Sequence, residues 1–424
     1  LNSTNIGLKW WRIPSLFRLE WRLFVMNLTA AQEIVRCGLN VDQTRRLNSF
    51  KKQLSIEKDA KRFDPRMKEY LLDVGINPDK ILKEIQFLDS NNWSQSHFRP
   101  ELLKVAYKNF QSQNGQNNSK NPNFIAAKTD LLHIVRNWDL KTLQYRCDKH
   151  IVEALPRKNS HAGFEFILTG KKLKGEYLEG IFSDYVEFEN KARLNGSFNS
   201  IILVGTRTQS SPPYDKESGE RFKDKSKIDK SKKSRFISIV GLKHVIAECK
   251  FAVPFQQRMS QEKWYHGGFD DSKTLDVITT WRDNFSHWTS IDYSAYDQNC
   301  SDWMIREAFD IIRYAFREDR SWDEELFKIV REDFINKVFW SGDGLIESHK
   351  GVPSGSMFTQ IIDTLINWLM IKTYMYARGI TRSEMMIMGD DNIIFTPEPL
   401  DTHDLSGYLD RVFKVPMNPT KCDA

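Results

Sequence analysis

Two short acidic stretches lie at the ends of apolar, strand-like runs. Asp292 follows the apolar run at residues 288–291, the usual place for a site residue in a sheet. Gly389-Asp390-Asp391 joins two further apolar runs and predicts a hairpin with two carboxylates at its tip. Exposed turns also use Asp and Gly, which is the alternative explanation. A hairpin that is apolar on both flanks, however, concentrates negative charge that a cation would relieve.

These carboxylates are the ligands that transfer of a nucleotide requires. That reaction uses two divalent ions, one at the attacking 3′ oxygen and one at the leaving pyrophosphate. Mg²⁺ takes only one or two protein carboxylates, so Asp292 and Asp390 suffice if their strands are neighbours. Taken alone, Asp292 is explained better as a helix N-cap, and the Gly-Asp-Asp turn is explained equally well by turn chemistry.

A polar stripe runs along an otherwise apolar helical stretch. Thr359, Asp363 and Asn367 recur every four residues and therefore share one face. A polar stripe is usually the solvated side of a helix, but apolar neighbours make this one narrow and semi-buried. Buried polar groups need partners, such as a ribose or a template strand. The preceding loop contains Ser354 and Gly355, and the glycine gives that loop freedom to move.

A charged run at residues 206–235 ends in net positive charge. Lys232, Lys233 and Arg235 stand directly before a strand-like stretch at residues 236–240. Such a group suits a triphosphate or a backbone phosphate. Without other signals, a solvated loop is the better explanation of this run.

The elements that would position these residues are strands alternating with helices. The chain has 424 residues, 40 % apolar letters and a net charge of +6, which allows a large core and is compatible with nucleic-acid binding without proving it. Its most apolar stretch is interrupted by polar residues, so we expect no membrane span. The expected elements are helices over 125–153, 301–316 (capped by Asp302) and 357–376, strands over 236–240 and 288–293, and hairpins over 338–348 and 385–395.

Taken in order, the four stretches resemble the motifs of viral RNA-dependent RNA polymerases. The basic residues 233–235 resemble motif F, and Asp292 with Asp297 resembles motif A. Residues 354–359, Ser-Gly-x3-Thr, resemble motif B, and Gly389-Asp390-Asp391 resembles motif C. Residues 418–421 resemble the end of motif D, so the resemblance covers about residues 232 to 424. It is nearest to the partitivirus-like and picobirnavirus-like, double-stranded RNA branch of the picornavirus-like polymerases.

The resemblance implies a role for each matching residue. One departure is that Asp363 stands where many relatives have Asn, so either Asp363 or Asn367 would contact the 2′-hydroxyl of the incoming nucleotide. The implied residues are Asp292 and Asp390 for the metals, Asp391 as a weaker third carboxylate, Asp297, Ser354 and Thr359 for the ribose, Asp363 or Asn367 for its 2′-hydroxyl, Lys233 and Arg235 for the triphosphate, and Lys421 as the proton donor to pyrophosphate.

The implied fold is α+β, a right-hand polymerase with an antiparallel palm sheet backed by helices. Residues 1–110 would form an N-terminal helical extension or fingers, residues 111–275 the fingers with motif F, and residues 276–424 the palm. The sequence ends just after motif D, so we expect the thumb to be missing and the chain to be a fragment.

The resemblance also implies cofactors, partners and a location. The cofactor would be Mg²⁺, with Mn²⁺ as the alternative, and the partners an RNA template, the product strand and ribonucleoside triphosphates. Capsid protein is a further expected partner, with no membrane contact, inside the virion or in the host cytoplasm. Two alternatives stay open. A reverse transcriptase usually has an aromatic residue where Asp297 stands, and a silent, RNA-binding polymerase remnant would not need the intact acids.

Overall fold

The computed structural model describes residues 39–55, 94–95, 100–112, 114–207, 210–211, 235–268, 271–340 and 344–422. They fall into two compact units. One takes in Asn109–Leu203 and Ser238–Ala424, and the other Asn40–Lys108 and Val204–Ile237. Lys233 lies outside the described residues, as do the side chains of Arg235 and Lys421. All remaining candidate site residues belong to the first unit.

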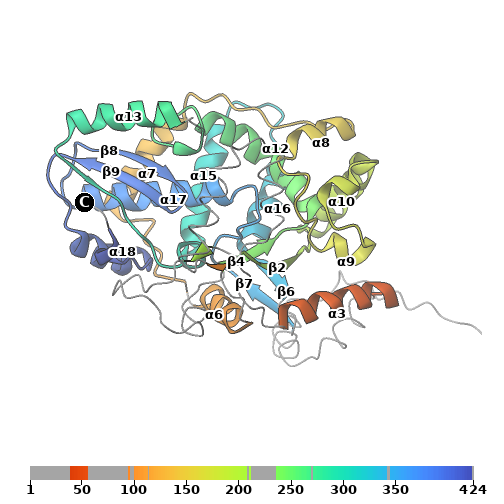
Figure 1. Cartoon of the computed structure of the whole chain (residues 1–424). Helices are drawn as coiled ribbons and strands as arrows, with labels where there is room; N and C mark the ends of the chain where they lie inside the picture. The colour runs from red at the N-terminus through yellow and green to blue at the C-terminus, as the bar shows by residue number, and fades with distance from the viewer. Residues whose placement is uncertain are drawn as a thin grey trace, which may run out of the picture. The chain divides into compact units, whose positions relative to one another are not determined.

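A three-stranded antiparallel sheet carries the acidic stretches (Figure 1). Its strands are β5 (His287–Thr289), β8 (Glu384–Met388) and β9 (Asp391–Thr396), in the order β5-β9-β8. Strand β9 pairs with β8 through the two-residue turn Gly389-Asp390. The predicted hairpin over 385–395 is therefore confirmed, whereas the strand predicted over 288–293 is shorter than expected and spans only His287–Thr289.

Helices cover both faces of this sheet. Trp281 of α13 (Asp271–Asn284) packs against Met386 and Phe395 on one face. Met385 and Ile387 point to the opposite face and are also buried, because side chains alternate along a strand. There α17 (Thr359–Ala377) packs against β8, as the long helix predicted over 357–376.

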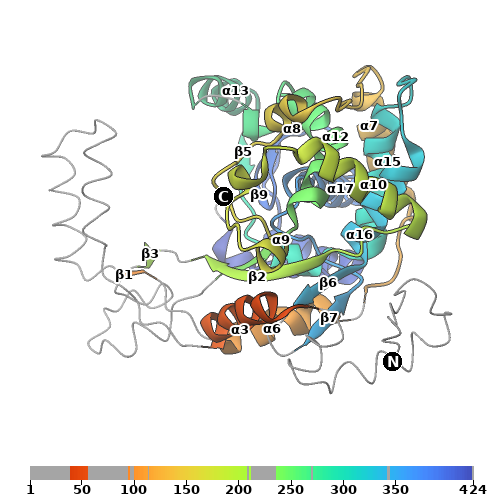
Figure 2. The ribbon, with the colours of Figure 1, turned by 90° about the vertical axis from the view of Figure 1, so that its right-hand side faces the viewer.

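Helix α17 is the centre of the first unit's core. Residues 361–371 of this helix are buried without a break, including Asp363, Thr364 and Asn367. Its neighbours are α7 (Pro122–Val135), α15 (Asp302–Ala315) and α18 (Thr402–Phe413), of which α7 and α15 lie beside it in Figure 2. The predicted polar stripe therefore faces protein rather than bulk water.

A second sheet has the order β4-β2-β6-β7, in which β6 runs parallel to β2 and antiparallel to β7, confirming the hairpin predicted over 338–348. No helix among the described residues is long and apolar enough to cross a membrane. The bounds are α3 Val41–Ser55, β1 Ser94–Gln95, α6 Pro100–Gln111, α8 Asp148–Ala154, α9 Glu165–Thr169, η1 Lys174–Tyr177, α10 Ile181–Asn195, β2 Ile201–Arg207, β3 Ser210–Ser211, β4 Arg235–Ile239, α12 Leu242–Met259, η2 His266–Gly268, α14 Tyr296–Asn299, α16 Glu324–Ile335, β6 Lys337–Trp340, β7 Leu345–Ser348 and η3 Pro419–Lys421.

Two predictions of local structure are wrong. The N-cap of α15 is Ser301, which has extended backbone angles, whereas Asp302 is already helical and accepts from the N–H of Trp303 at 2.7 Å. The helix predicted over 125–153 is interrupted between α7 and α8. The intervening chain bonds to α12 instead, with the Leu143 N–H donating to the Lys250 carbonyl at 2.9 Å.

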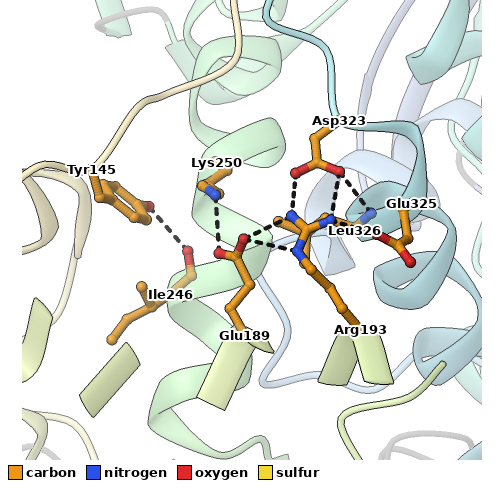
Figure 3. A network of polar contacts seen from close by, with 8 residues as sticks. All are labelled: Tyr145, Glu189, Arg193, Ile246, Lys250, Asp323, Glu325 and Leu326. Carbon is orange, nitrogen blue, oxygen red and sulfur yellow. Dashed lines mark hydrogen bonds and ion pairs between the residues drawn. The ribbon is translucent and has the colours of Figure 1, made fainter. Parts of the chain in front are cut away.

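A network of charged side chains ties α10, α12 and the start of α16 together (Figure 3). Lys250 of α12 donates to Glu189 at 3.0 Å, and Arg193 donates to both Glu189 and Asp323. Asp323 in turn caps α16 by accepting from the Leu326 N–H at 3.0 Å. Lys250 is buried and the other three residues are half-buried, and each has a partner of opposite charge, so leaving Lys250 unpaired would be the most costly of these losses.

Candidate active site

Antiparallel register brings the two acidic stretches to one end of the sheet. Thr289 lies opposite Ile394 in the β5–β9 pair. Continuing that register by three residues places Asp292 opposite Asp391. The Ile291 N–H supports this continuation, because it donates to the side chain of Asn392 at 3.2 Å. Asp292 and Asp391 are both exposed, and so is Asp390 in the turn beside them.

The end of the predicted motif D lies beside Asp292. The Asn418 N–H donates to the Asp292 carbonyl at 3.1 Å, and the Ser294 N–H donates to the Pro416 carbonyl at 2.9 Å. Asp292 is therefore fixed from both sides, by β9 and by residues 416–418. It is not the helix N-cap that was the alternative explanation, since Ala295 precedes the short helix α14.

The Gly389-Asp390 turn is bonded to α17. Gly389 has a φ of +68°, which favours glycine, and its N–H donates to the Thr364 hydroxyl at 2.9 Å. The Asn367 side-chain NH₂ donates to the Gly389 carbonyl at 2.9 Å and to the Asp390 carbonyl at 3.3 Å. The Asn367 oxygen accepts from the Tyr293 hydroxyl at 2.7 Å. We call Asn367 with Tyr293 the turn clasp, because the pair links the chain after Asp292 to the chain around Asp390.

Asp363 is a buried acid beside other acids. Its side chain is 4 % exposed, and its Oδ1 has no hydrogen-bond partner in the described part of the chain. Burial, followed by the negative charges of Asp297 and Asp390, raises the pKa of Asp363 well above its usual range. Burial therefore favours the acid form of Asp363 more than in an exposed aspartate, and that form can donate a hydrogen bond as well as accept one.

The 351–358 loop leads into α17 and lies against α14. The Val352 N–H donates to the Asp297 carbonyl at 2.7 Å. Ser354 is exposed, and its hydroxyl accepts from the Ser238 N–H at 2.9 Å. The Thr359 hydroxyl donates within the loop, 2.8 Å from the Pro353 carbonyl. Of the predicted ribose residues, Ser354 can therefore still donate its hydroxyl proton to another partner, whereas Thr359 donates its hydroxyl proton to the loop.

The acids fit a metal ion held by few protein ligands. Within the described ranges, no three His, Cys, Asp or Glu side chains stand together as a ready-made metal site. Mg²⁺ does not require such a cage, because it is bound by one or two carboxylates together with substrate phosphates and water. Asp292 and Asp390, exposed at one end of the sheet, supply those carboxylates.

Three polar residues that hold the site were not singled out from the sequence. They are Tyr293, which bonds Asn367, Thr364, which bonds the Gly389-Asp390 turn, and Glu248 of α12, which bonds the 351–358 loop. Glu248 does leave a signal, since it is a charged letter between apolar residues on a helix. No sequence pattern marks Tyr293 or Thr364, because each is a residue type that is common in its local structure.

Comparison with known protein families identifies the family of this chain. A family model described as "Viral RNA-dependent RNA polymerase" matches residues 55–424. The chain belongs to this family. The match takes in both acidic stretches and α17, and it confirms the resemblance drawn from the sequence motifs. The family uses divalent metal ions.

Individual relatives match over shorter stretches. An RNA-directed RNA polymerase of Cryptosporidium parvum virus 1 (strain KSU-1) is 33 % identical over 109 residues, which is 25 % of this chain and 20 % of that protein. One of Atkinsonella hypoxylon virus (isolate 2H) is 37 % identical over 79 residues, 17 % of this chain and 12 % of that protein. A genome polyprotein of Ljunganvirus 1 is 27 % identical over 112 residues, 26 % of this chain and 5 % of the polyprotein. The matched stretches thus span a fifth or less of each relative. The first two relatives confirm the expected double-stranded RNA, partitivirus-like branch.

Proposed function

We propose that this protein synthesises RNA on an RNA template from ribonucleoside triphosphates, for replication and transcription of a viral genome. The observation that carries the proposal is the β5–β9 pairing, which ends at Thr289 and Ile394 and whose continued register would bring Asp292 beside Asp391, within a chain of the polymerase family. In this proposal the sheet β5-β9-β8 with α13 and α17 is the palm of a right-hand polymerase. The α12 and α10 region belongs to the fingers.

Asp292 and Asp390 are the proposed metal ligands, with Asp391 as the third carboxylate. Bound Mg²⁺ would activate the 3′ oxygen of the product strand and neutralise the leaving pyrophosphate, and Mn²⁺ is the alternative ion. The protein's own contribution is to hold the carboxylates in place. The turn clasp does this for Asp390, and the backbone bonds to Asn392 and Asn418 do it for Asp292.

Asp363 is the proposed contact for the 2′-hydroxyl, together with Asp297 and Ser354. Asn367 is 0 % exposed, and both its carbonyl oxygen and its NH₂ group are already bonded, so it has no group to offer a nucleotide. Asp363 has an oxygen without a partner in the described region, and its raised pKa favours the acid form, which could donate to a hydroxyl. A site built to hydrogen-bond a hydroxyl rejects the sugar that lacks it, because its own polar groups are then left unpaired.

Three basic residues complete the proposal. Lys233 and Arg235 hold the triphosphate, because a guanidinium pairs with two phosphate oxygens at once. Lys421, at the end of η3, donates a proton to the leaving pyrophosphate. The support for Lys421 is the backbone bond from Asn418 to Asp292, which brings η3 to the acidic end of the sheet. The expected macromolecular partners are template and product RNA, with capsid protein as a further one.

A primer-extension assay tests the proposal. The purified chain is given homopolymer RNA templates, Mg²⁺ and either ribo- or deoxyribonucleotides, and we expect extension with ribonucleotides. Asp390→Asn should abolish extension while the circular dichroism spectrum and unfolding midpoint stay unchanged. Glu398→Gln is the matched control, because it removes one exposed negative charge away from the acidic end of the sheet.

Each alternative gives a different result in the same assay. Equal use of both sugars by the unmutated protein would favour a reverse transcriptase. RNA binding without extension, at any Mg²⁺ or Mn²⁺ concentration, would favour a silent remnant. Extension that survives Asp390→Asn would refute the assignment of the metal ligands.

A further inference from the structure

Glu248 is a buried carboxylate inside an apolar helix. It lies on α12 with a side chain that is 1 % exposed, between Ala247 and Cys249, which are also buried. Neither of its oxygens forms an ion pair with Lys or Arg within 4 Å among the described residues. Burying a carboxylate is expensive unless its oxygens are hydrogen-bonded, so the identity of its partners shows what it is for.

Both oxygens of Glu248 are bonded to the 351–358 loop. Oε1 accepts from the Ser356 hydroxyl at 2.6 Å, and Oε2 accepts from the Met357 N–H at 2.8 Å. The Ser356 hydroxyl also accepts from the Phe358 N–H at 3.0 Å, so its one proton points to Glu248. A single carboxylate thereby fixes three consecutive residues directly before α17.

The same loop is pressed against β4 on its other side. The Ser238 N–H donates to the Ser354 hydroxyl, and Gly355 lies so close that an added Cβ would stand 2.1 Å from the Ser238 carbonyl oxygen. Residues 354 and 355 are therefore held by β4, and residues 356–358 by Glu248. The exposed face of Ser354 depends on both attachments.

We propose that Glu248 is a positioning residue for nucleotide selection, which fixes the 351–358 loop so that Ser354 and Asp363 meet the ribose together. The inference rests on the proposed polymerase function. Glu248 does not itself reach the nucleotide, because both its oxygens are used on the loop and its side chain is enclosed. It acts through the loop's geometry, and a loosened loop lowers affinity for the correct sugar more than it slows the chemical step.

The groups around Glu248 make this contact sensitive to pH near neutrality. Burial raises the pKa of Glu248 to about 7, against the hydrogen bonds from Ser356 and Met357 and the charge of Lys174. His244 lies one turn earlier on α12, with its Nε2 3.6 Å from Oε1, and burial lowers the pKa of His244 to about 3, so it stays neutral. The pKa of Cys249 is raised by burial, so the thiol also stays neutral. Above about pH 7, Glu248 accepts both bonds as a carboxylate, and below it one oxygen carries a proton and the loop is held less firmly.

The test compares Glu248→Gln with a matched, half-buried acid. Asp333 also accepts from one serine hydroxyl and one backbone N–H, those of Ser197 at 2.7 Å and Phe198 at 2.5 Å, but it does not touch the 351–358 loop. We expect Glu248→Gln to raise the nucleotide KM about tenfold with a smaller change in kcat, as for loss of a charge-assisted hydrogen bond. Discrimination against deoxyribonucleotides should fall, and the rise of KM below pH 7 should disappear. Asp333→Asn should leave the KM, the sugar preference and the pH profile unchanged.

A second measurement is independent of activity. Amide hydrogen exchange at residues 354–359 should be faster in Glu248→Gln and unchanged in Asp333→Asn. Unchanged exchange there, or a KM and pH profile in the active Glu248→Gln protein equal to those of the unmutated chain, would overturn the inference. If the unmutated chain extends no primer, the proposed polymerase function fails, and the exchange data still decide whether Glu248 positions the loop.

Discussion

The turn clasp makes a quantitative prediction about how the acidic end of the sheet is held. Tyr293→Phe removes one hydroxyl and changes little else in shape. The lost bond is 2.7 Å long, Tyr293 is 7 % exposed and Asn367 is 0 % exposed, so the Asn367 oxygen is left buried without that donor. Leaving a buried acceptor unsatisfied costs about 1–3 kcal/mol, and we expect the free energy of unfolding to fall by that amount.

Asn367→Ala should cost more, because it removes the partner of three groups. The Tyr293 hydroxyl and the carbonyls of Gly389 and Asp390 all lose a bond, so we expect a loss of about 3–5 kcal/mol. In the double variant the Tyr293–Asn367 bond can be lost only once. The two effects should therefore fall short of their sum by about 1–2 kcal/mol.

Two assays check this prediction. Urea unfolding of the two single variants and the double variant gives the coupling energy, with Thr373→Ala as the control. Thr373 is also fully buried on α17, but among the described residues its hydroxyl bonds only to the Leu369 carbonyl of the same helix. In primer extension, Asn367→Ala should raise the Mg²⁺ concentration for half-maximal synthesis about tenfold, as loss of an outer support of a metal ligand does. Additive energies, or a Mg²⁺ requirement equal to that of Thr373→Ala, would refute the clasp as the support of Asp390.

The other predictions concern nucleotide binding, sugar selection and pH. Arg235→Ala should raise the nucleotide KM about tenfold while RNA affinity, measured by filter binding, changes less; unchanged nucleotide kinetics would exclude Arg235 from the triphosphate site. Asp297→Ala should reduce discrimination between ribo- and deoxyribonucleotides in single-nucleotide incorporation, and unchanged discrimination would exclude Asp297 from the ribose site. Burial lowers the pKa of Lys337 from 10.5 to about 7. The folded chain then binds fewer protons than the unfolded chain between pH 7 and 10.5. The free energy of unfolding should therefore rise with pH across that window by up to about 4 kcal/mol. In urea titrations, Lys337→Met should flatten this rise.

The local elements of the site could be predicted from the sequence, because each depends on a pattern of residues that are neighbours in the chain. The hairpin over 385–395 shows two apolar runs around a glycine, and α17 shows an apolar run too long for a strand. The cap of α15 was placed one residue late, since Ser301 and Asp302 are both good caps and only the backbone angles separate them. The helix expected over 125–153 failed because the tertiary bond from Leu143 to Lys250 competes with helical propensity.

The way in which the elements pack against one another could not be predicted from the individual residues. Thr289 and Ile394 are far apart in the chain, and only their pairing directs the chain after β5 toward Asn392 and the acidic turn. The sequence correctly predicts that the polar stripe lies on one helix face. The different roles of Asp363 and Asn367, however, depend on which residues of other elements lie next to each of them. Asn367 meets Tyr293 and the turn, whereas Asp363 meets other acids. The ordered motifs nevertheless pointed to the right family, because several separate signals occur in the order typical of that family.

The short strand β5 limits where residues can be inserted into or deleted from this chain. Side chains alternate along a strand, so a shift of one residue would turn Asp292 from the face of Asp391 to the face packed on α17. Beyond β5 the register is pinned at Ile291, Asp292 and Ser294 by bonds to Asn392, Asn418 and Pro416. A single-residue insertion between residues 289 and 294 should therefore silence the protein, whereas one at the exposed residues 282–284 at the end of α13 leaves this pinned stretch intact. Natural length variation among functional relatives should accordingly avoid the first stretch.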